Sequence, residues 1–374
     1  MQRHMPQPAL SIPQPRDNPD LIGHESAEAA LLQAFWKKRL HHAWLITGQR
    51  GIGKATLAFR FARFLLANGN RERNGPTFCL PDENLAPDLT VDPEHPTFRR
   101  IASGGHADLI AVGRRVNEKT GRLRSEILVE DVRSVGSLLA HTPAEDGWRV
   151  VVIDAAEDMS RSSANAVLKV LEEPPTRSIL LLVCHAPGKV LPTIRSRCRH
   201  LALQPLSRDT VMTLLHRYRP ALSAVEADDL ARLCGGSIGL ALSLGEHDGL
   251  ALHKVMLDLM RKLPALDILA LDRLGDQVSG SGSDETFAMA CDFFTRLVTR
   301  LIRTAAVQAE HGGDASGSDE QSVVARLAPA ASLDRWLEVW EKTCRLLARA
   351  ENANLDRKQV ILDLFLTLQR AVRS

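Results

Sequence analysis

The chain has 374 residues, of which 44% are hydrophobic and 25% charged, and its formal net charge is +2. Length and composition are ordinary for a soluble globular protein of about two or three domains, each large enough to bury a core. The small net charge excludes a protein whose whole surface clamps nucleic acid, so any contact of that kind has to be local.

Cysteine usage and apolar runs indicate the compartment. The six cysteines are scattered along the chain and include no Cys-x-x-Cys pair, which favours reduced thiols over a disulfide framework. No apolar run approaches the roughly 18 residues that a membrane helix needs. Residues 1–20 contain five prolines and no apolar signal core, so we expect a disordered tail rather than an export signal. A cytoplasmic protein without a membrane partner is expected.

The first motif is a glycine-rich loop between a short apolar strand at 43–47 and a helix that is expected to begin at Lys54. The loop has the pattern G-x-x-x-x-G-K in the strand–loop–helix context that phosphate-binding loops require. Gly48, Gly51 and Gly53 let the backbone wrap around phosphates, the amides and the helix N-terminus donate to them, and Lys54 adds positive charge.

The residue after the lysine departs from this pattern. A hydroxyl at this position ligates Mg²⁺, and the chain has Ala55 there, with Thr56 one residue later. One residue along a helix rotates the side chain by about 100°, so Thr56 is not expected to replace the missing hydroxyl. The loop therefore predicts phosphate binding without metal-assisted hydrolysis. A glycine-rich turn that binds nothing stays open as the alternative.

Residues 68–125 form a polar, loop-rich insertion with proline and glycine throughout. Cys79, His95 and His106 within it lack the close cysteine pairing that zinc sites show. Its arginines alternate with acidic residues, which favours a solvated face over a nucleic-acid patch. We therefore expect no metal in this insertion.

A second motif region begins with the apolar strand at 150–153 and its terminal Asp154. In ATP-hydrolysing P-loop proteins such an aspartate holds Mg²⁺, and an acid that follows it polarises the attacking water. The chain has Ala155 in place of that acid. Another continuous apolar run, 179–184, predicts a strand covered on both faces and leads to the arginine-rich turn at 195–199. A site that keeps its arginines but lacks the acid that polarises water predicts a protein that acts on the nucleotide bound by another protein.

Apolar runs and helical patterns alternate through the first part of the chain. This alternation predicts an α/β fold, with a parallel sheet and helices on both faces. After Pro205 only helical patterns follow, and the apolar faces at 287–303 and 356–372 are expected to pack in a helical bundle. The expected strands are 43–47, 127–129, 150–153, 179–184 and 201–203.

Gly235-Gly236-Ser237-Ile238-Gly239 matches, as text, the G-x-S-x-G nucleophile elbow of a hydrolase. That elbow needs a strand before the serine, whereas a helical pattern at 227–233 precedes Ser237. We interpret the glycines as the end of one helix and Ser237 as the N-cap of the next.

Four segments occur together in an order and spacing that resemble a known family. They are the loop at 48–56, the strand end at 151–154, the run at 165–175 with its Leu-Glu-Glu-Pro-Pro ending, and the turn at 191–198. Together they resemble bacterial clamp-loader subunits of the AAA+ class, most closely those of the delta-prime type in DNA polymerase III. The likeness covers residues 20–245 by motif and the remainder by its general helical texture.

The resemblance implies three domains after the tail. They are an AAA+ nucleotidase-like α/β domain at 21–205, which includes the insertion at 68–125, a helical lid domain at 206–247 and a helical collar (oligomerisation) domain at 248–374. It also implies a place in the DNA polymerase III holoenzyme, a DNA-directed DNA polymerase, as a subunit that helps load the sliding clamp onto primed DNA during replication. The implied partners are gamma/tau-like ATPase subunits and a delta-like subunit, with the clamp and primer–template DNA reached through the complex.

In the ring that this family forms, the arginine of a Ser-Arg-Cys turn reaches the ATP of the adjacent ATPase subunit. Here that turn is Ser196-Arg197-Cys198. The resemblance therefore implies that Arg197 acts as an arginine finger in trans. A planar, permanently charged guanidinium suits the charge that develops on the transferred phosphoryl group.

Four positions favour a non-motor subunit over a motor. Ala55 lacks the Mg²⁺ hydroxyl, and Ala155 stands where a motor has its catalytic acid. Cys184-His185 stand where a motor has the threonine that senses the γ-phosphate, and Gly239 stands where it has a second sensing arginine. The resemblance thus implies a non-motor (stator) subunit of the delta-prime type with little or no ATPase activity of its own.

No cofactor is required by this interpretation. The degenerate phosphate loop, with Gly48, Gly51, Gly53, Lys54 and Thr56, and the degenerate Mg²⁺ position Asp154 leave residual ATP or ADP binding open. The cysteine-rich zinc module of many relatives is reduced to Cys79, so zinc is not expected. Two other functions stay open, which are an ATP-hydrolysing motor that uses Lys54 and Asp154 and a serine hydrolase that uses Ser237.

Overall fold

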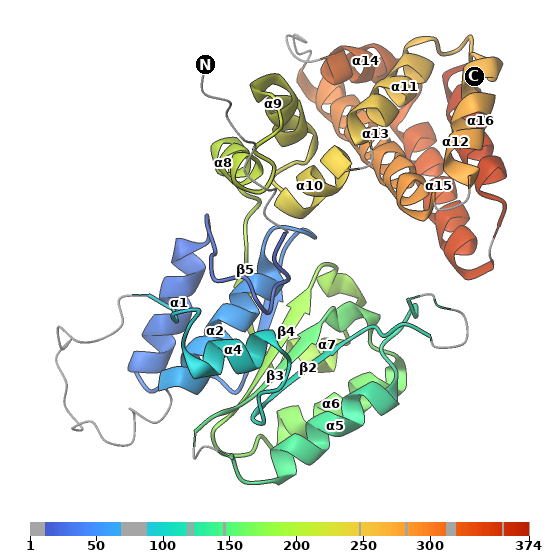
Figure 1. Cartoon of the computed structure of the whole chain (residues 1–374). Coiled ribbons are helices and arrows are strands. Elements are labelled where there is room, and N and C mark those ends of the chain that lie inside the picture. Colours follow the sequence, from blue (N-terminus) through green and yellow to red (C-terminus); the bar gives the residue numbers. More distant parts are fainter. Residues whose placement is uncertain are drawn as a thin grey trace, which may run out of the picture. The chain divides into compact units, whose positions relative to one another are not determined.

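The structure is a computed structural model, and the chain divides into two compact units (Figure 1). The first unit ends at Ala241 and the second begins at Leu242. Within the described part of the chain, no helix has both the length and the apolar character to cross a membrane. The described residues are 12–68, 88–117, 121, 123–144, 147–246, 248–280, 283–311, 319–353 and 355–373.

The first unit is built on a parallel sheet of five strands in the order β2-β3-β4-β1-β5. All four strand pairings are parallel, and all seven residues of the central strand β4 are buried. This burial on both faces is the reason for its continuous apolar sequence. The strands are β1 (Ala43–Thr47), β2 (Leu109–Gly113), β3 (Arg149–Asp154), β4 (Ser178–Cys184) and β5 (Arg199–Ala202).

Helices cover both faces of the sheet, so the predicted α/β fold is confirmed (Figure 1). On one face α1 (Glu25–Trp36), α2 (Lys54–Asn68) and α4 (Pro96–Ala102) share an apolar core with alternate strand residues such as Val150 and Val152. On the other face α5 (Val129–Ala140), α6 (Arg161–Glu172) and α7 (Pro192–Arg195) pack on Val151 and Ile153. The alternation follows from the period of two in a strand.

One expectation about local structure was wrong. Residues 127–129 do not form a strand, because Ile127 makes only an isolated bridge to Met159 and α5 already begins at Val129. Within the described residues of the insertion at 68–125, α4 and the edge strand β2 are elements that the sequence did not predict. Only one residue of β2 is buried, Val112, so this strand lacks the continuous apolar run that marks a central strand.

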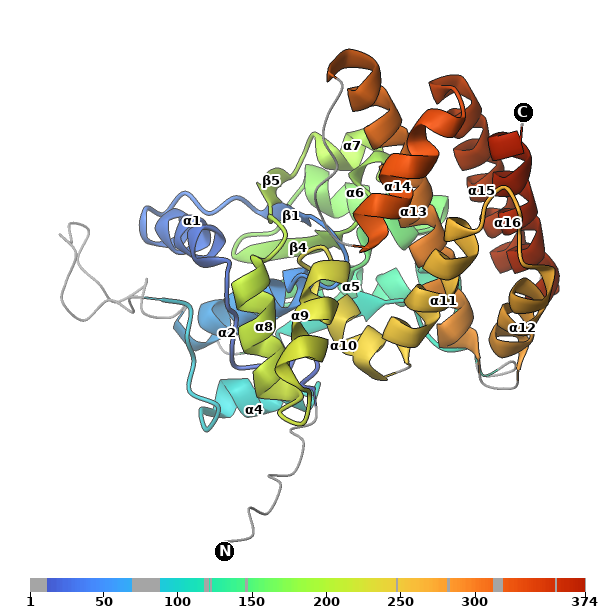
Figure 2. The same cartoon turned by 90° about the horizontal axis from the view of Figure 1, so that it is seen from above.

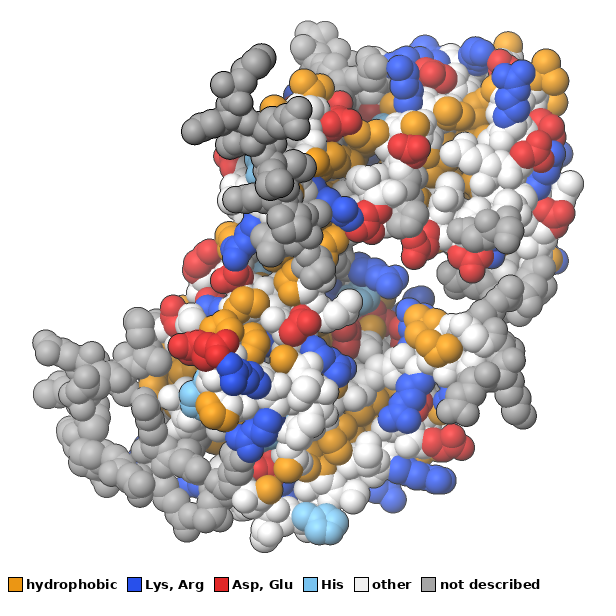
Figure 3. Space-filling model, viewed as in Figure 1, with side chains coloured by type: hydrophobic (Ala, Val, Ile, Leu, Met, Phe, Trp, Pro, Cys, Tyr) orange, Lys and Arg blue, Asp and Glu red, His pale blue; other side chains and the backbone are white. Residues whose placement is uncertain are grey.

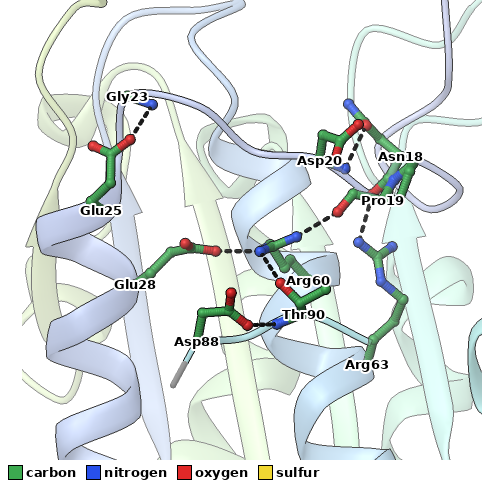
Figure 4. A network of polar contacts seen from close by, with 10 residues as sticks. All are labelled: Asn18, Pro19, Asp20, Gly23, Glu25, Glu28, Arg60, Arg63, Asp88 and Thr90. Atoms are coloured by element: carbon green, nitrogen blue, oxygen red, sulfur yellow. Dashed lines mark hydrogen bonds and ion pairs between the residues drawn. The ribbon is translucent and has the colours of Figure 1, made fainter. Parts of the chain in front are cut away.

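A network of polar contacts holds the segment that precedes α1 (Figure 4). The Arg63 guanidinium donates to the carbonyl oxygens of Arg16 at 3.0 Å and Asn18 at 2.6 Å. Arg60 donates to the Pro19 carbonyl and forms an ion pair with Glu28 of α1. The boundary that we predicted at residue 20 for the disordered tail therefore falls too late, because two buried arginines of α2 bind the chain from Arg16 onward.

Three helices follow the sheet domain, namely α8 (Arg208–Tyr218), α9 (Ala224–Leu233) and α10 (Ile238–Glu246). Ser207 and Ser223 cap the first two, since each side chain accepts an amide of the first turn. The boundary between the two compact units falls inside α10. The division into separate lid and collar domains stays a prediction.

The second unit is all helical, and α13 is its central helix, in contact with the five others (Figure 2). The apolar faces expected for the bundle are buried, and the rings of Phe294 and Phe365 meet edge to face with centroids 5.3 Å apart. The helices are α11 (Gly249–Arg261), α12 (Ile268–Ser279), α13 (Asp284–His311), α14 (Asp319–Leu327), α15 (Leu333–Ala353) and α16 (Arg357–Arg373).

Candidate functional site

The glycine-rich loop joins β1 to α2, as its pattern predicts. Gly48, Gly51 and Gly53 have φ angles of 145°, 78° and 106°, a region that glycine enters readily and other residues rarely do. Lys54 is the first residue of α2, and its side chain is buried. The glycines of the pattern are thus explained by the backbone angles that the loop adopts.

Lys54 bends back onto its own loop. Its Nζ donates to the Gly48 carbonyl at 2.7 Å and to the Gln49 carbonyl. Burial lowers the pKa of Lys54 to about 8, although the carboxylates of Asp154 and Glu157 oppose this shift. An incoming phosphate would have to take the ammonium from these two carbonyl groups.

The start of α10 contacts the next two residues of the loop. The Ser237 hydroxyl donates to the Arg50 carbonyl at 2.8 Å, and the Gly239 amide donates to the Gly51 carbonyl at 2.9 Å. A Cβ at Gly239 would lie 2.9 Å from the Gly51 Cα, which is too close for any side chain. An arginine therefore does not fit at this position while α10 keeps this contact.

The segment before α1 contacts the other side of the loop. His24 is buried, and its Nε2 lies 2.6 Å from the Ile52 carbonyl oxygen, which can only accept. Together with the contacts of Lys54, Ser237 and Gly239, this bond means that all five carbonyl groups of residues 48–52 accept a hydrogen bond. The loop is held in one conformation by three separate parts of the chain.

These contacts also show what Ser237 does. The element before it is the helix α9 rather than a strand, and its hydroxyl is buried and bonded to the phosphate loop. The Ser237 hydroxyl also accepts the Leu240 amide at 3.2 Å, as an N-cap does. The expectation of an N-cap serine is confirmed, and a hydrolase elbow at Ser237 is excluded.

The acidic side of the site lies at the carboxyl edge of the sheet, beside the loop. Asp154 ends β3, and burial raises the pKa of its carboxyl, with Lys54 as the opposing charge. Ala155 follows and is buried. Three residues after Asp154 comes Glu157, whose Oε1 accepts the His185 amide at 2.8 Å and the Ala186 amide at 3.2 Å. The Glu157 carboxylate therefore holds the end of β4 through one of its two oxygens.

The other residues considered as ligands have structural roles or lie elsewhere. The His95 side chain accepts the Thr97 amide and caps α4. Cys79 lies outside the described residues. Thr56 lies two residues into α2 and is half-buried. The described residues contain no group of three or more histidine, cysteine, aspartate or glutamate side chains placed to hold a metal ion.

The arginines of the insertion pair with acids. Arg114 lies 3.1 Å from Asp158, and Arg115 lies 3.1 Å from Asp131. Figure 3 shows basic and acidic side chains interspersed on the visible face of the first unit. This pairing agrees with a solvated face.

The arginine-rich turn is built on a buried cysteine. Cys198 is buried, and burial raises the pKa of its thiol to about 12. Ser196 is the C-cap of α7, and its hydroxyl donates to the Thr193 carbonyl at 3.1 Å. Between them, the Arg197 side chain remains 38% exposed. Ser196 and Cys198 are thus held by the surrounding structure, whereas the side chain of Arg197 between them is accessible to solvent.

The two parts of the predicted site lie at opposite edges of the sheet. The loop follows the carboxyl end of β1, whereas Arg197 precedes the amino end of β5. These strands pair in parallel, with Trp44 opposite Arg199 and Thr47 opposite Ala202. The structure therefore brings Lys54 and Asp154 together and keeps Arg197 away from both of them.

Sequence patterns did not reveal three residues of these sites. His24 contacts Ile52, Glu157 contacts the amides of 185–186, and Glu172, although part of the motif at 165–175, forms an ion pair with Arg197 that its spacing does not predict. A pattern of short spacings carries no signal for such partners, because only the folded chain brings them together.

Comparisons with known proteins agree with the motifs. The model of a family described as DNA polymerase III, delta subunit, matches residues 23–207. The DNA polymerase III subunit gamma of Buchnera aphidicola is 31% identical over 61% of this chain and 57% of its own length. The subunit delta' of Pseudomonas aeruginosa is 31% identical over 55% of this chain and 57% of its length.

The chain thus spans a little over half the length of these two relatives, and 32% of the Escherichia coli subunit tau, to which it is 32% identical. One solved structure, of a gamma-subunit-related protein from Thermotoga maritima, covers 92% of this chain and 100% of its own, at 17% identity and a TM-score of 0.36.

Proposed function

The chain belongs to the clamp-loader family of DNA polymerase III subunits, and from that premise we propose that it is a non-motor subunit of the delta-prime type. In this role it helps load the sliding clamp onto primed DNA during replication. It holds its place in a ring of subunits and lends Arg197 to the ATP of a neighbouring ATPase subunit.

One observation carries this proposal, namely the position of Arg197 at the edge of the sheet opposite to the phosphate loop. An arginine there is remote from the nucleotide site of its own chain but accessible from outside. A finger that acts in trans needs this combination. Its guanidinium can meet a phosphoryl group with two hydrogen bonds and full charge, which is worth roughly 10³ to 10⁵ in rate.

The nucleotide site of this chain supports a non-hydrolysing role. Ala55 and Ala155 provide neither the Mg²⁺ hydroxyl nor the water-polarising acid, and Glu157 is bonded to the backbone of residues 185–186. Lys54 and the loop glycines would bind the phosphates of ATP or ADP, and Asp154 stands at the position of a Mg²⁺ ligand. Hydrolysis depends almost wholly on positioning and electrostatics, so these losses favour a site without turnover.

The partners follow from the same proposal. We propose gamma/tau-like ATPase subunits and a delta-like subunit as ring neighbours, and contact with the clamp and primer–template DNA through the complex. The helices from α8 to α10, within residues 206–247, would form the lid domain, and residues 248–374 the collar domain, in a protein of the cytoplasm.

The alternative is an ATP-hydrolysing motor subunit. The intact lysine of the loop and the nearby Asp154 favour it. The two roles differ in a direct measurement, since a motor hydrolyses ATP by itself and loses this activity on Lys54→Ala. The proposed non-motor chain shows no turnover above background when it is measured alone.

Substitution of Arg197 tests the proposal in the assembled loader. In a complex whose other ATPase sites carry inactivating substitutions, Arg197→Ala is expected to lower DNA-stimulated ATP turnover by about 10³- to 10⁵-fold. The matched control is Arg195→Ala, which removes an arginine of the same turn that donates to the Pro187 carbonyl. Unchanged turnover and clamp loading with Arg197→Ala would show that the finger role is wrong.

A further inference from the structure

Arg197 already has an anionic partner within its own chain. Its Nη2 lies 3.0 Å from Oε1 of Glu172, and its Nη1 donates to the Thr193 carbonyl at 3.1 Å. Glu172 is the last residue of α6 and belongs to the Glu-Glu-Pro-Pro run that ends this helix. The Glu172 side chain is 52% exposed, so a second anion can reach the pair from solvent.

We propose that Glu172 is the resting counter-ion of Arg197. It is a positioning residue that holds the guanidinium until the γ-phosphate of a neighbouring subunit's ATP displaces it. This inference rests on the finger role proposed above and adds the group that regulates it. The step exchanges one ionic partner for another, so no covalent bond forms or breaks.

The strengths of the two interactions fit such an exchange. An exposed ion pair of this kind favours its bound state by about 1.5- to 5-fold only. A γ-phosphate has a larger charge and several acceptor oxygens, and it can take two guanidinium hydrogen bonds at once. The carboxyl end of α6 carries partial negative charge, so it favours the return of the arginine once the phosphate has left.

The chain offers a matched control next to the proposed residue. Glu173 has the same charge, is exposed, and caps the same helix. Among the ion pairs of the described residues, none includes Glu173. A substitution of Glu173 therefore changes the net charge of this surface as a change at Glu172 does, without releasing the finger.

The experiment compares Glu172→Gln with Glu173→Gln in the loader complex whose only active ATPase site is the one that Arg197 faces. Glu172→Gln is expected to lower the KM for ATP by about 1.5- to 5-fold with kcat unchanged, because the pair no longer competes with the γ-phosphate. Glu173→Gln should leave the KM unchanged. The inhibition constant of ADP should not change in either variant, since ADP has no γ-phosphate. High salt, which screens exposed pairs, should reduce the difference between wild type and Glu172→Gln.

The double variant Glu172→Gln with Arg197→Ala separates the counter-ion role of Glu172 from the finger role of Arg197. The KM effect of Glu172→Gln should disappear in the Arg197→Ala background, because no finger remains to be released. Equal effects of Glu172→Gln and Glu173→Gln, a raised KM, or an effect that persists without Arg197 would each overturn the counter-ion role. If Arg197→Ala alone leaves turnover unchanged, the finger role itself is wrong.

Discussion

Addition of one methyl group at Gly51 tests whether α10 holds the phosphate loop. Gly51 has a φ of 78°, and a Cβ there would lie 2.4 Å from Ser237 Oγ and 3.1 Å from Gly239 Cα. The left-handed backbone costs an alanine roughly 1–2 kcal/mol, and an overpacked contact costs about 1–3 kcal/mol. Gly51→Ala is therefore expected to lower the free energy of unfolding by about 2–5 kcal/mol.

Gly121 provides the control for the cost of an alanine in the left-handed backbone conformation. Its φ is 65°, and among the described residues, its chain neighbours apart, no heavy atom lies within 4 Å of a Cβ built on it. Gly121→Ala should therefore cost only the backbone contribution, about 1–2 kcal/mol. Urea unfolding followed by far-ultraviolet circular dichroism gives both values from the midpoint and the slope. The difference between the two variants measures the contact with α10.

A double-mutant cycle assigns that difference to Ser237. Ser237→Ala removes the hydroxyl that the new methyl group would meet, so the cost of Gly51→Ala should be smaller in this background by about 1 kcal/mol. If Gly51→Ala costs no more than Gly121→Ala, or if its cost is the same with and without the Ser237 hydroxyl, the loop is not held by this contact.

Two buried cations give further predictions. Burial lowers the pKa of Lys54 from 10.5 to about 8. At a pH between these two values, the lysine is protonated in the unfolded chain and neutral in the folded chain. The free energy of unfolding therefore rises with pH through that range. Relative to Lys54→Met, the wild-type chain should gain up to about 3 kcal/mol between pH 7 and pH 10.5 in urea unfolding, and a constant difference would contradict this. Arg63→Met removes two hydrogen bonds from a charged group to the Arg16 and Asn18 carbonyls and should cost about 3 kcal/mol and speed proteolysis before α1. The exposed control Arg99→Met should cost about 1 kcal/mol or less, and equal losses in these two variants would refute the role of Arg63.

The sequence alone determined the elements whose signals are local. The continuous apolar run of β4 predicts a strand buried on both faces, and the glycine pattern before Lys54 predicts a loop between a strand and a helix. Apolar spacing likewise predicts α13 and α16 and the faces that they bury. In each of these elements, burial and backbone angle restrict the residue types of a short continuous stretch, so the stretch can be recognised from its own sequence.

Only the tertiary structure decided what depends on distant partners. The edge strand β2 has few buried residues and is defined by its pairing with β3. The phosphate loop owes its fixed conformation to His24, Ser237 and Gly239, which come from both sides of it in the chain. The parallel pairing of β1 with β5 places Arg197 at the edge opposite to Lys54. Hydrogen bonds, ion pairs and strand register join residues across any separation in the chain, so the spacing of residues in a sequence does not encode them.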